Sequence, residues 1–153
     1  MFVMTAKLSK PRLIAAGVLI LAVVIVVLRQ MLRPVQRVGR ADAPDGATND
    51  ARLAYLAGFG WSVNGTPKQT QQVRIPKSAD DRVFSRYNAL QKSQGFDLTA
   101  YAGKEATRYV YEILNYPDAS APVYASVLVL DGHIIGGDIT DTAPGGAIHG
   151  FCK

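Results

Sequence analysis

The sequence is poor in the side chains that most often build metal and catalytic centres. Its 153 residues include one cysteine, Cys152, and two histidines, His133 and His149. A single cysteine excludes an intrachain disulfide and indicates no redox compartment. The spacing of the histidines and their acidic neighbours matches no zinc-binding motif. A phosphate-binding loop and a serine nucleophile elbow are also missing, so the sequence predicts neither an enzyme nor a cofactor.

Charge is distributed unevenly along the chain. The formal net charge of +5 comes from 17 basic and 12 acidic side chains, and seven of the basic ones lie in residues 1–40, where no acid occurs. Residues 41–153 therefore carry ten basic and twelve acidic side chains, a net charge of −2. Because this part has no basic stripe with interleaved aromatics, we expect no nucleic-acid partner.

A long apolar run lies near the N-terminus. Residues 13–28 are sixteen uncharged, almost wholly apolar side chains. A helix needs about 20 residues to cross the hydrocarbon core, and residues 30–32 can extend the run while flanking arginines reach the headgroups. The sequence therefore predicts a transmembrane anchor over residues 13–32, with the lipid bilayer as a partner. The basic flanks of this anchor are Lys7, Lys10, Arg12, Arg29 and Arg33.

A cleaved signal peptide is the alternative interpretation of this run. Its charged start and apolar middle fit such a peptide, but Arg29 and Arg33 stand where small neutral side chains should precede a cleavage site. The positive-inside rule does not decide the orientation, because each side carries four positive charges when the N-terminal amine is counted. A short tail before a larger downstream domain is typical of signal anchors. We therefore expect a single-pass protein of the cell membrane with its C-terminal domain outside the cytoplasm.

These features divide the chain into four segments. Residues 1–12 are a short basic tail, 13–32 the anchor, 33–48 a basic juxtamembrane segment and linker, and 49–153 a small domain. Small, polar and turn-forming side chains dominate residues 39–49, so we expect this stretch to lie outside the core. The remaining residues, about 105, suffice for one small core.

Two helices are expected in the domain. Thr48 or Asn49 caps the first, which runs through Ala57. The second follows a cap at Ser78, has Asp81 in its first turn and ends at Gly95. Its apolar side is predicted to carry Val83, Phe84, Tyr87 and Leu90, and its solvent side Arg82, Arg86, Gln91 and Lys92.

Strand patterns complete an α+β fold in the order α-β-β-α-β-β-β. Residues 61–63 and 71–75 flank the hairpin turn signal Asn64-Gly65. Strands are also expected at 107–116, 123–130 and 133–139, with a type I′ turn at Asp131-Gly132 and a bulge or close backbone approach at Gly136-Gly137. A short final strand is expected at 148–151. The sum is a small domain with a mainly antiparallel sheet and a helix packed on it.

A polar cluster follows the last long strand and supplies the candidate ligand-binding residues. They are Asp138, Thr140, Asp141 and His149. Loops after strands often bind small polar ligands. The alternative is a turn in which Asp and Thr side chains satisfy local backbone amides. The numerous tyrosines, with Trp61 and Phe84, line either a groove for a peptide or glycan or simply the core.

A string of short motifs resembles a known bacterial family. The motifs are LAYL at 53–56, GWSV at 60–63, VRIP at 73–76, LQKSQGFDL at 90–98, YAGK at 101–104, DGHIIGGDI at 131–139 and HGF at 149–151. They resemble the domain of unknown function numbered 4830, and the likeness covers about residues 50–153. The resemblance implies small, membrane-anchored or exported proteins of Gram-positive bacteria. It implies no activity, so no site residues are carried over.

The sequence thus favours a membrane protein that presents a non-enzymatic binding domain outside the cell, for an envelope protein or peptide. The alternative is an envelope ligand or metal sensor that uses the region of Asp138, Asp141 and His149.

Overall fold

The computed structural model describes residues 43–78 and 81–152. The predicted anchor at 13–32, its basic flanks and most of the predicted linker lie outside these residues. Across the two described ranges, no helix has both the length and the apolar character to cross a membrane.

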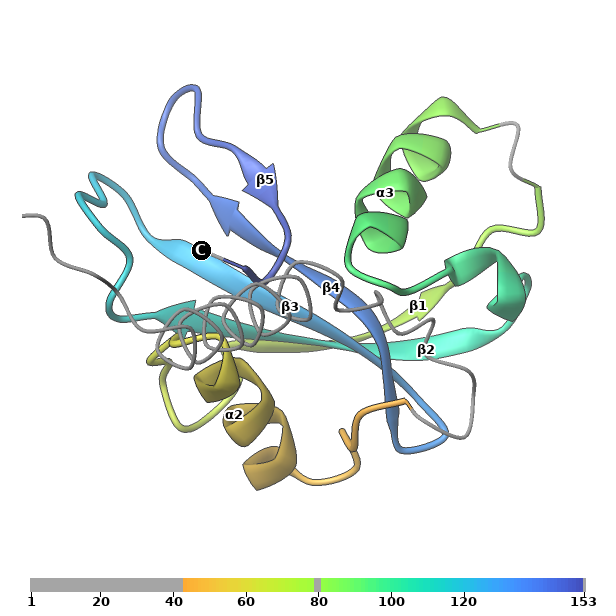
Figure 1. Cartoon of the computed structure of the whole chain (residues 1–153), viewed down its shortest axis with the longest axis horizontal. Coiled ribbons are helices and arrows are strands. Elements are labelled where there is room, and N and C mark those ends of the chain that lie inside the picture. The colour runs from red at the N-terminus through yellow and green to blue at the C-terminus, as the bar shows by residue number, and fades with distance from the viewer. Residues whose placement is uncertain (1–42, 79–80, 153) are drawn as a thin grey trace, which may run out of the picture. The chain divides into compact units, whose positions relative to one another are not determined.

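A five-stranded antiparallel sheet forms the centre of the domain (Figure 1). Its strands are β1 (Gln69–Arg74), β2 (Glu105–Ile113), β3 (Val123–Leu130), β4 (His133–Asp141) and β5 (Ile148–His149). Their order across the sheet is their order along the chain, so β1 and the two-residue β5 form the edges. This arrangement confirms the α+β fold with a mainly antiparallel sheet.

Two α-helices cover opposite faces of the sheet (Figure 1). They are α2 (Asn49–Gly58), capped by Thr48 as predicted, and α3 (Arg82–Ser93), which is followed by the 3₁₀-helix η1 (Leu98–Tyr101). Alternation along each strand divides the apolar side chains between two cores. In β2, Tyr111 packs with Leu56 of α2, whereas Ala106 packs with Phe84 of α3. The α2 core is the larger of the two.

The hairpin predicted at Asn64-Gly65 is wrong. Val63 forms only an isolated bridge with Ile113, and β1 pairs with β2 rather than with residues 61–63. Trp61 is buried in the α2 core, where its indole Nε1 donates to the Phe151 carbonyl at 2.6 Å. Burial of the indole outweighs the local strand signal, and the turn residues become part of a longer connection to β1.

The solvent and core sides of α3 also differ from the prediction. The cap is Asp81 rather than Ser78, and the Asp81 carboxylate accepts from the backbone N–H groups of Val83 and Phe84. Val83, expected to be in the core, is 78% exposed, and Gln91, expected in solvent, is fully buried. Helical spacing puts Phe84, Asn88 and Gln91 on one side, and the two buried amides are tolerated because each hydrogen-bonds to backbone groups.

Part of the predicted linker belongs to the domain. The Ile134 N–H donates to the Pro44 carbonyl at 2.8 Å, and the Gly46 N–H donates to the Gly132 carbonyl at 2.9 Å. Gly46 is buried, and a Cβ there would lie 2.7 Å from Cγ1 of Ile134. Composition alone did not reveal that a segment without large side chains can pair with the first residues of β4.

The turn and the bulge predicted around β4 are confirmed. Asp131 and Gly132 have φ values of +50° and +78°, as a type I′ turn requires. The register between β3 and β4 shifts between Leu128 and Val129, next to the predicted Gly136-Gly137 pair. A Cβ on Gly137 would collide with the Ser126 carbonyl and the Phe151 ring, so the glycine permits a close approach.

Candidate ligand-binding cleft

The sheet separates the four candidate residues from the sequence into two pairs. Asp138 and Thr140 alternate onto the α3 face, whereas His149 pairs with Ile139, a residue of the α2 core. Asp141 also alternates onto the α2 face. Its carboxylate accepts from the Ala143 N–H at 2.9 Å, so for Asp141 the structure shows the local turn that was expected as the alternative to a ligand site. One site made from Asp138, Asp141 and His149 is therefore not what the structure shows.

Metal-ligating side chains do not gather elsewhere in the described ranges either. Within residues 43–78 and 81–152, no group of three or more His, Cys, Asp or Glu side chains is close enough to hold a metal ion.

A cleft of about 310 Å³ opens on the α3 face, over the strands and beside the N-terminal half of α3. This volume lies at the small end of the range for ligand sites, roughly 300 to 1,000 Å³. Its walls are mainly apolar, and its polar groups converge on the sheet. The apolar lining is Val73, Ile75, Pro76, Phe84, Leu98, Leu128 and Ile148, and the polar lining is Arg74, Tyr87, Arg108, Asp138 and Thr140.

Asp138 is the most enclosed charged group of this cleft, with 5% of its surface exposed. Its Oδ1 accepts from the Tyr87 hydroxyl and its Oδ2 from the Thr140 hydroxyl, each at 2.8 Å. Burial, and then the nearby charge of Asp138, raises the pKa of the Tyr87 phenol. Tyr87 is therefore a permanent donor to the carboxylate.

Arg108 lies in the same cleft, half-buried. Its Nε and Nη2 donate to the Ser126 hydroxyl oxygen at 3.2 and 3.0 Å. Ser126 is fully buried and faces Asp138 across the β3–β4 ladder, so it lies beside both charged groups. Arg108 and Asp138 are not in ion-pair contact with each other, which would require 4.0 Å or less.

The strand pattern explains why these groups share a face. Arg108 lies between Ala106 and Val110, two buried residues on the same face of β2, and Ser126 and Asp138 occupy matching positions in β3 and β4. The sequence reasoning missed Arg108 and named Tyr87 among the tyrosines that line either a groove or the core. A charged side chain between two small apolar ones on one strand face was the signal that could have found Arg108.

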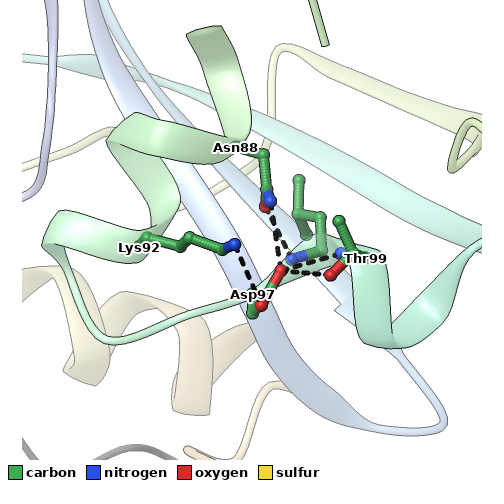
Figure 2. A network of polar contacts seen from close by, with 5 residues as sticks. Asn88, Lys92, Asp97 and Thr99 are labelled. Atoms are coloured by element: carbon green, nitrogen blue, oxygen red, sulfur yellow. Dashed lines mark hydrogen bonds and ion pairs between the residues drawn. The ribbon is translucent and has the colours of Figure 1, made fainter. Parts of the chain in front are cut away.

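A polar network fixes the far wall of the cleft (Figure 2). The Asn88 carbonyl oxygen accepts from the Leu98 N–H at 2.8 Å, and its amide donates to Asp97 at 3.1 Å. Asp97 also accepts from the N–H and hydroxyl of Thr99, and Lys92 lies 3.4 Å away. This network ties η1 to α3 and so holds Leu98 in place against the cleft.

The ionisation of Asp97 reflects this network. Partial burial favours the neutral acid, but the hydrogen bonds from Thr99 and Asn88, with the contact to Lys92, outweigh it and lower the pKa of Asp97 to about 2. The carboxylate is therefore charged at any physiological pH.

A second recess, of about 540 Å³, lies at the other face near the C-terminus. Trp61, Tyr116, Pro117, His149 and Cys152 line it. The Trp61 and Tyr116 rings stack with centroids 5.6 Å apart, and the Tyr116 hydroxyl lies 3.2 Å from Nε2 of His149. This is where the structure places His149, in an aromatic setting without a partner carboxylate among the lining residues.

The family comparison covers most of this framework. A family described as "Domain of unknown function (DUF4830)" matches residues 55–139, more than half of the chain. The chain belongs to this family. The matched span of the DUF4830 domain includes Tyr87, Arg108, Ser126 and Asp138 and ends just before Thr140. No curated protein and no solved structure is detectably similar to the chain.

Proposed function

We propose that this DUF4830 protein is a single-pass membrane protein whose domain binds a small ligand outside the cytoplasm, without chemical conversion. The observation that carries the binding function is the polar part of the cleft, where Arg108 and Asp138 of the sheet and Tyr87 of α3 lie among apolar walls. Such a combination of apolar lining with a few convergent polar groups is typical of ligand sites.

The polar part of the cleft is rigid in a way that suits binding. Asp138 belongs to β4, an inner strand of the sheet, and Tyr87 of α3 donates to it at 2.8 Å. Polar groups already held by neighbours lose little entropy when a ligand arrives, and this raises affinity. The Asn88–Asp97 network gives the η1 wall the same support.

Binding is favoured over catalysis because the acid–base groups of the cleft are already engaged. Both oxygens of Asp138 accept hydrogen bonds from hydroxyl groups, and Tyr87 stays protonated. These contacts hold the Asp138 carboxylate and the Tyr87 hydroxyl in a fixed arrangement, which suits binding more than proton transfer.

The membrane location rests on the sequence. The uncharged run at residues 13–28 and its basic flanks support an anchor, and the short basic tail before them supports an exterior domain.

The binding function is tested by ligand-observed NMR on the full chain in nanodiscs, with a mixture of small charged and neutral apolar compounds. Ile148→Trp, at the rim of the cleft, should fill it and abolish saturation transfer to the compounds that bind. Leu114→Trp is the matched control, because both side chains are 60% exposed and Leu114 lies outside the cleft. Equal signals from both variants, or no signal from the unmodified chain, would refute a ligand site here.

The location is tested separately with a tag placed after the C-terminus. We expect an external protease to remove the tag from intact cells. Protection until lysis would place the domain in the cytoplasm, and the arginines after residue 28 would then be the positive-inside signal.

A further inference from the structure

Three charged side chains line the cleft; Arg74 is paired with Glu105 at 2.6 Å, whereas Arg108 and Asp138 form no ion pair with each other. Arg108 is held by Ser126, and Asp138 is held by Tyr87 and Thr140. Across the described ranges, neither has an ion-pair partner within 4.0 Å. Asp138 is buried, and a buried charge is costly unless it is paired or hydrogen-bonded. The cleft therefore offers a half-buried cation and a buried anion that form no ion pair with each other.

The Arg108 guanidinium has donors to spare. Arginine has five N–H groups, and the bonds to Ser126 use one on Nε and one on Nη2. The remaining donors include both N–H groups of Nη1. A carboxylate is the group that matches adjacent guanidinium donors in shape and charge.

Asp138 has acceptor capacity left as well. A carboxylate has about four lone-pair positions, and the two hydroxyl donors occupy one on each oxygen. Tyr87 and Thr140 approach as neutral groups, and no ion pair to Asp138 within 4.0 Å occurs among the described residues. An ammonium group, with three N–H donors, is the complementary partner.

The walls of the cleft determine the expected size and polarity of the rest of the ligand. Most of the lining is apolar, and a volume of about 310 Å³ accommodates a body of a few aliphatic or aromatic carbons. Ile148 lies at the rim with 60% of its surface exposed, and burial of this side chain by a ligand would add apolar contact.

We infer that the cleft binds a small zwitterion with an apolar body, whose carboxylate contacts Arg108 and whose ammonium group contacts Asp138. This inference rests on the proposed ligand-binding function and names its ligand class. A free apolar amino acid and a short apolar peptide share this chemistry. They differ in the separation of the two charges, and the experiment distinguishes them.

The experiment is calorimetric titration of the full chain in nanodiscs of neutral lipid, which adds no anionic competitor. The probes are L-leucine and leucyl-leucine, with three leucine derivatives that lack one or both charges. N-acetyl-leucine lacks the ammonium, leucinamide lacks the carboxylate and N-acetyl-leucinamide lacks both. We expect one of the two zwitterions to bind, and each derivative that lacks one charge to bind at least tenfold more weakly than that zwitterion, because charged hydrogen bonds are worth at least that factor.

Substitutions assign each charge to its partner. Arg108→Gln should remove the preference for leucine over leucinamide, and Asp138→Asn the preference for leucine over N-acetyl-leucine. Arg86→Gln and Asp118→Asn are the matched controls, because both side chains are exposed and neither lines the cleft. If a cleft variant does not fold, the derivative series on the unmodified chain still decides.

The outcomes separate the ligand class from the binding function. N-acetyl-leucinamide binding as tightly as the zwitterions would overturn the zwitterion inference and leave the binding function in place. The zwitterion inference also fails if none of the five probes binds in the calorimetric titration. In that case the binding function still stands if other compounds give NMR signals that Ile148→Trp abolishes. If nothing binds in either experiment, both proposals fail. The tighter of leucine and leucyl-leucine identifies the source of the zwitterion.

Discussion

Gln91 is the residue whose replacement tests the structure most directly. Its side-chain oxygen accepts from the Gly137 N–H at 2.8 Å, and its amide donates to the Gly137 carbonyl at 2.9 Å. The side chain therefore pairs with β4 as a neighbouring strand would. Gln94 adds a second bond to the Gly137 carbonyl and accepts from the Phe151 N–H. We predict that Gln91→Leu destabilises the domain by about 2 kcal/mol.

This magnitude follows from what each backbone group loses. The Gly137 carbonyl keeps the Gln94 amide, at 3.0 Å, but the buried Gly137 N–H loses its acceptor. An orphaned buried donor costs about 1 to 3 kcal/mol. The leucine also brings a branched group next to Gly136. Packing is already tight there, because a Cβ built on Gly136 would lie only 2.7 Å from Oε1 of Gln91. The apolar gain of leucine offsets only part of these costs.

Urea unfolding of the full chain in neutral detergent, followed by tryptophan fluorescence, measures this change. Trp61 is the only tryptophan of the chain and is buried, so the signal reports the domain alone. Gln71→Leu, on the exposed edge strand β1, is the matched control and should change the free energy of unfolding by less than about 0.5 kcal/mol. A Gln91→Leu variant within the same limit would refute the argument that this side chain completes the ladder of β4.

Three further predictions concern other parts of the domain. Val127→Asp should abolish the cooperative unfolding transition, because Val127 is fully buried. Leu128→Asp should retain a transition, because Arg108 is the cross-strand neighbour of Leu128. Loss of the transition in both variants, or in neither, would contradict this distinction. Gly132→Val should lower the free energy of unfolding by about 1 to 2 kcal/mol at its φ of +78°, and an unchanged urea midpoint would contradict the type I′ turn. Because the pKa of Asp97 is lowered on folding, its carboxylate stabilises the folded domain fully above pH 3.8, and this contribution is lost as the pH falls toward about 2. Asp97→Asn should remove about 1 kcal/mol of pH dependence from the free energy of unfolding in this window, after allowance for solvent screening. An acid transition identical to that of the unmodified chain would contradict this role.

The strands predicted from the sequence were those with strong local signals. The alternation of residues 107–116 and 123–130 and the turn at Asp131-Gly132 each favour one pairing, and the structure has that pairing. The hairpin at Asn64-Gly65 failed because its first strand contained Trp61. A large buried aromatic ring gains more from the α2 core than from a two-residue ladder.

Only half of the candidate site was predictable from the sequence, because its polar side chains lie on a strand face where apolar core residues are expected. Asp138 and Thr140 were expected to form part of a site, and they do line the cleft. Their partner Tyr87 was expected either in a groove or in the core, and Arg108 lay without an assigned role in the strand predicted at 107–116. A sequence shows which side chains share a face, but it does not show that a gap remains above them.

The gap itself follows from how α3 is held. The C-terminal half of this helix is fixed by amides, through Asn88, Gln91 and Gln94, which need directional hydrogen bonds rather than close apolar packing. The N-terminal half contributes Phe84 and Tyr87, and the cleft lies beneath them. Because the larger core is on the α2 face, the α3 face can leave this space open without loss of the main apolar burial. The larger core on the α2 face and the hydrogen-bonded polar groups on the α3 face are the two features on which the proposed binding function rests.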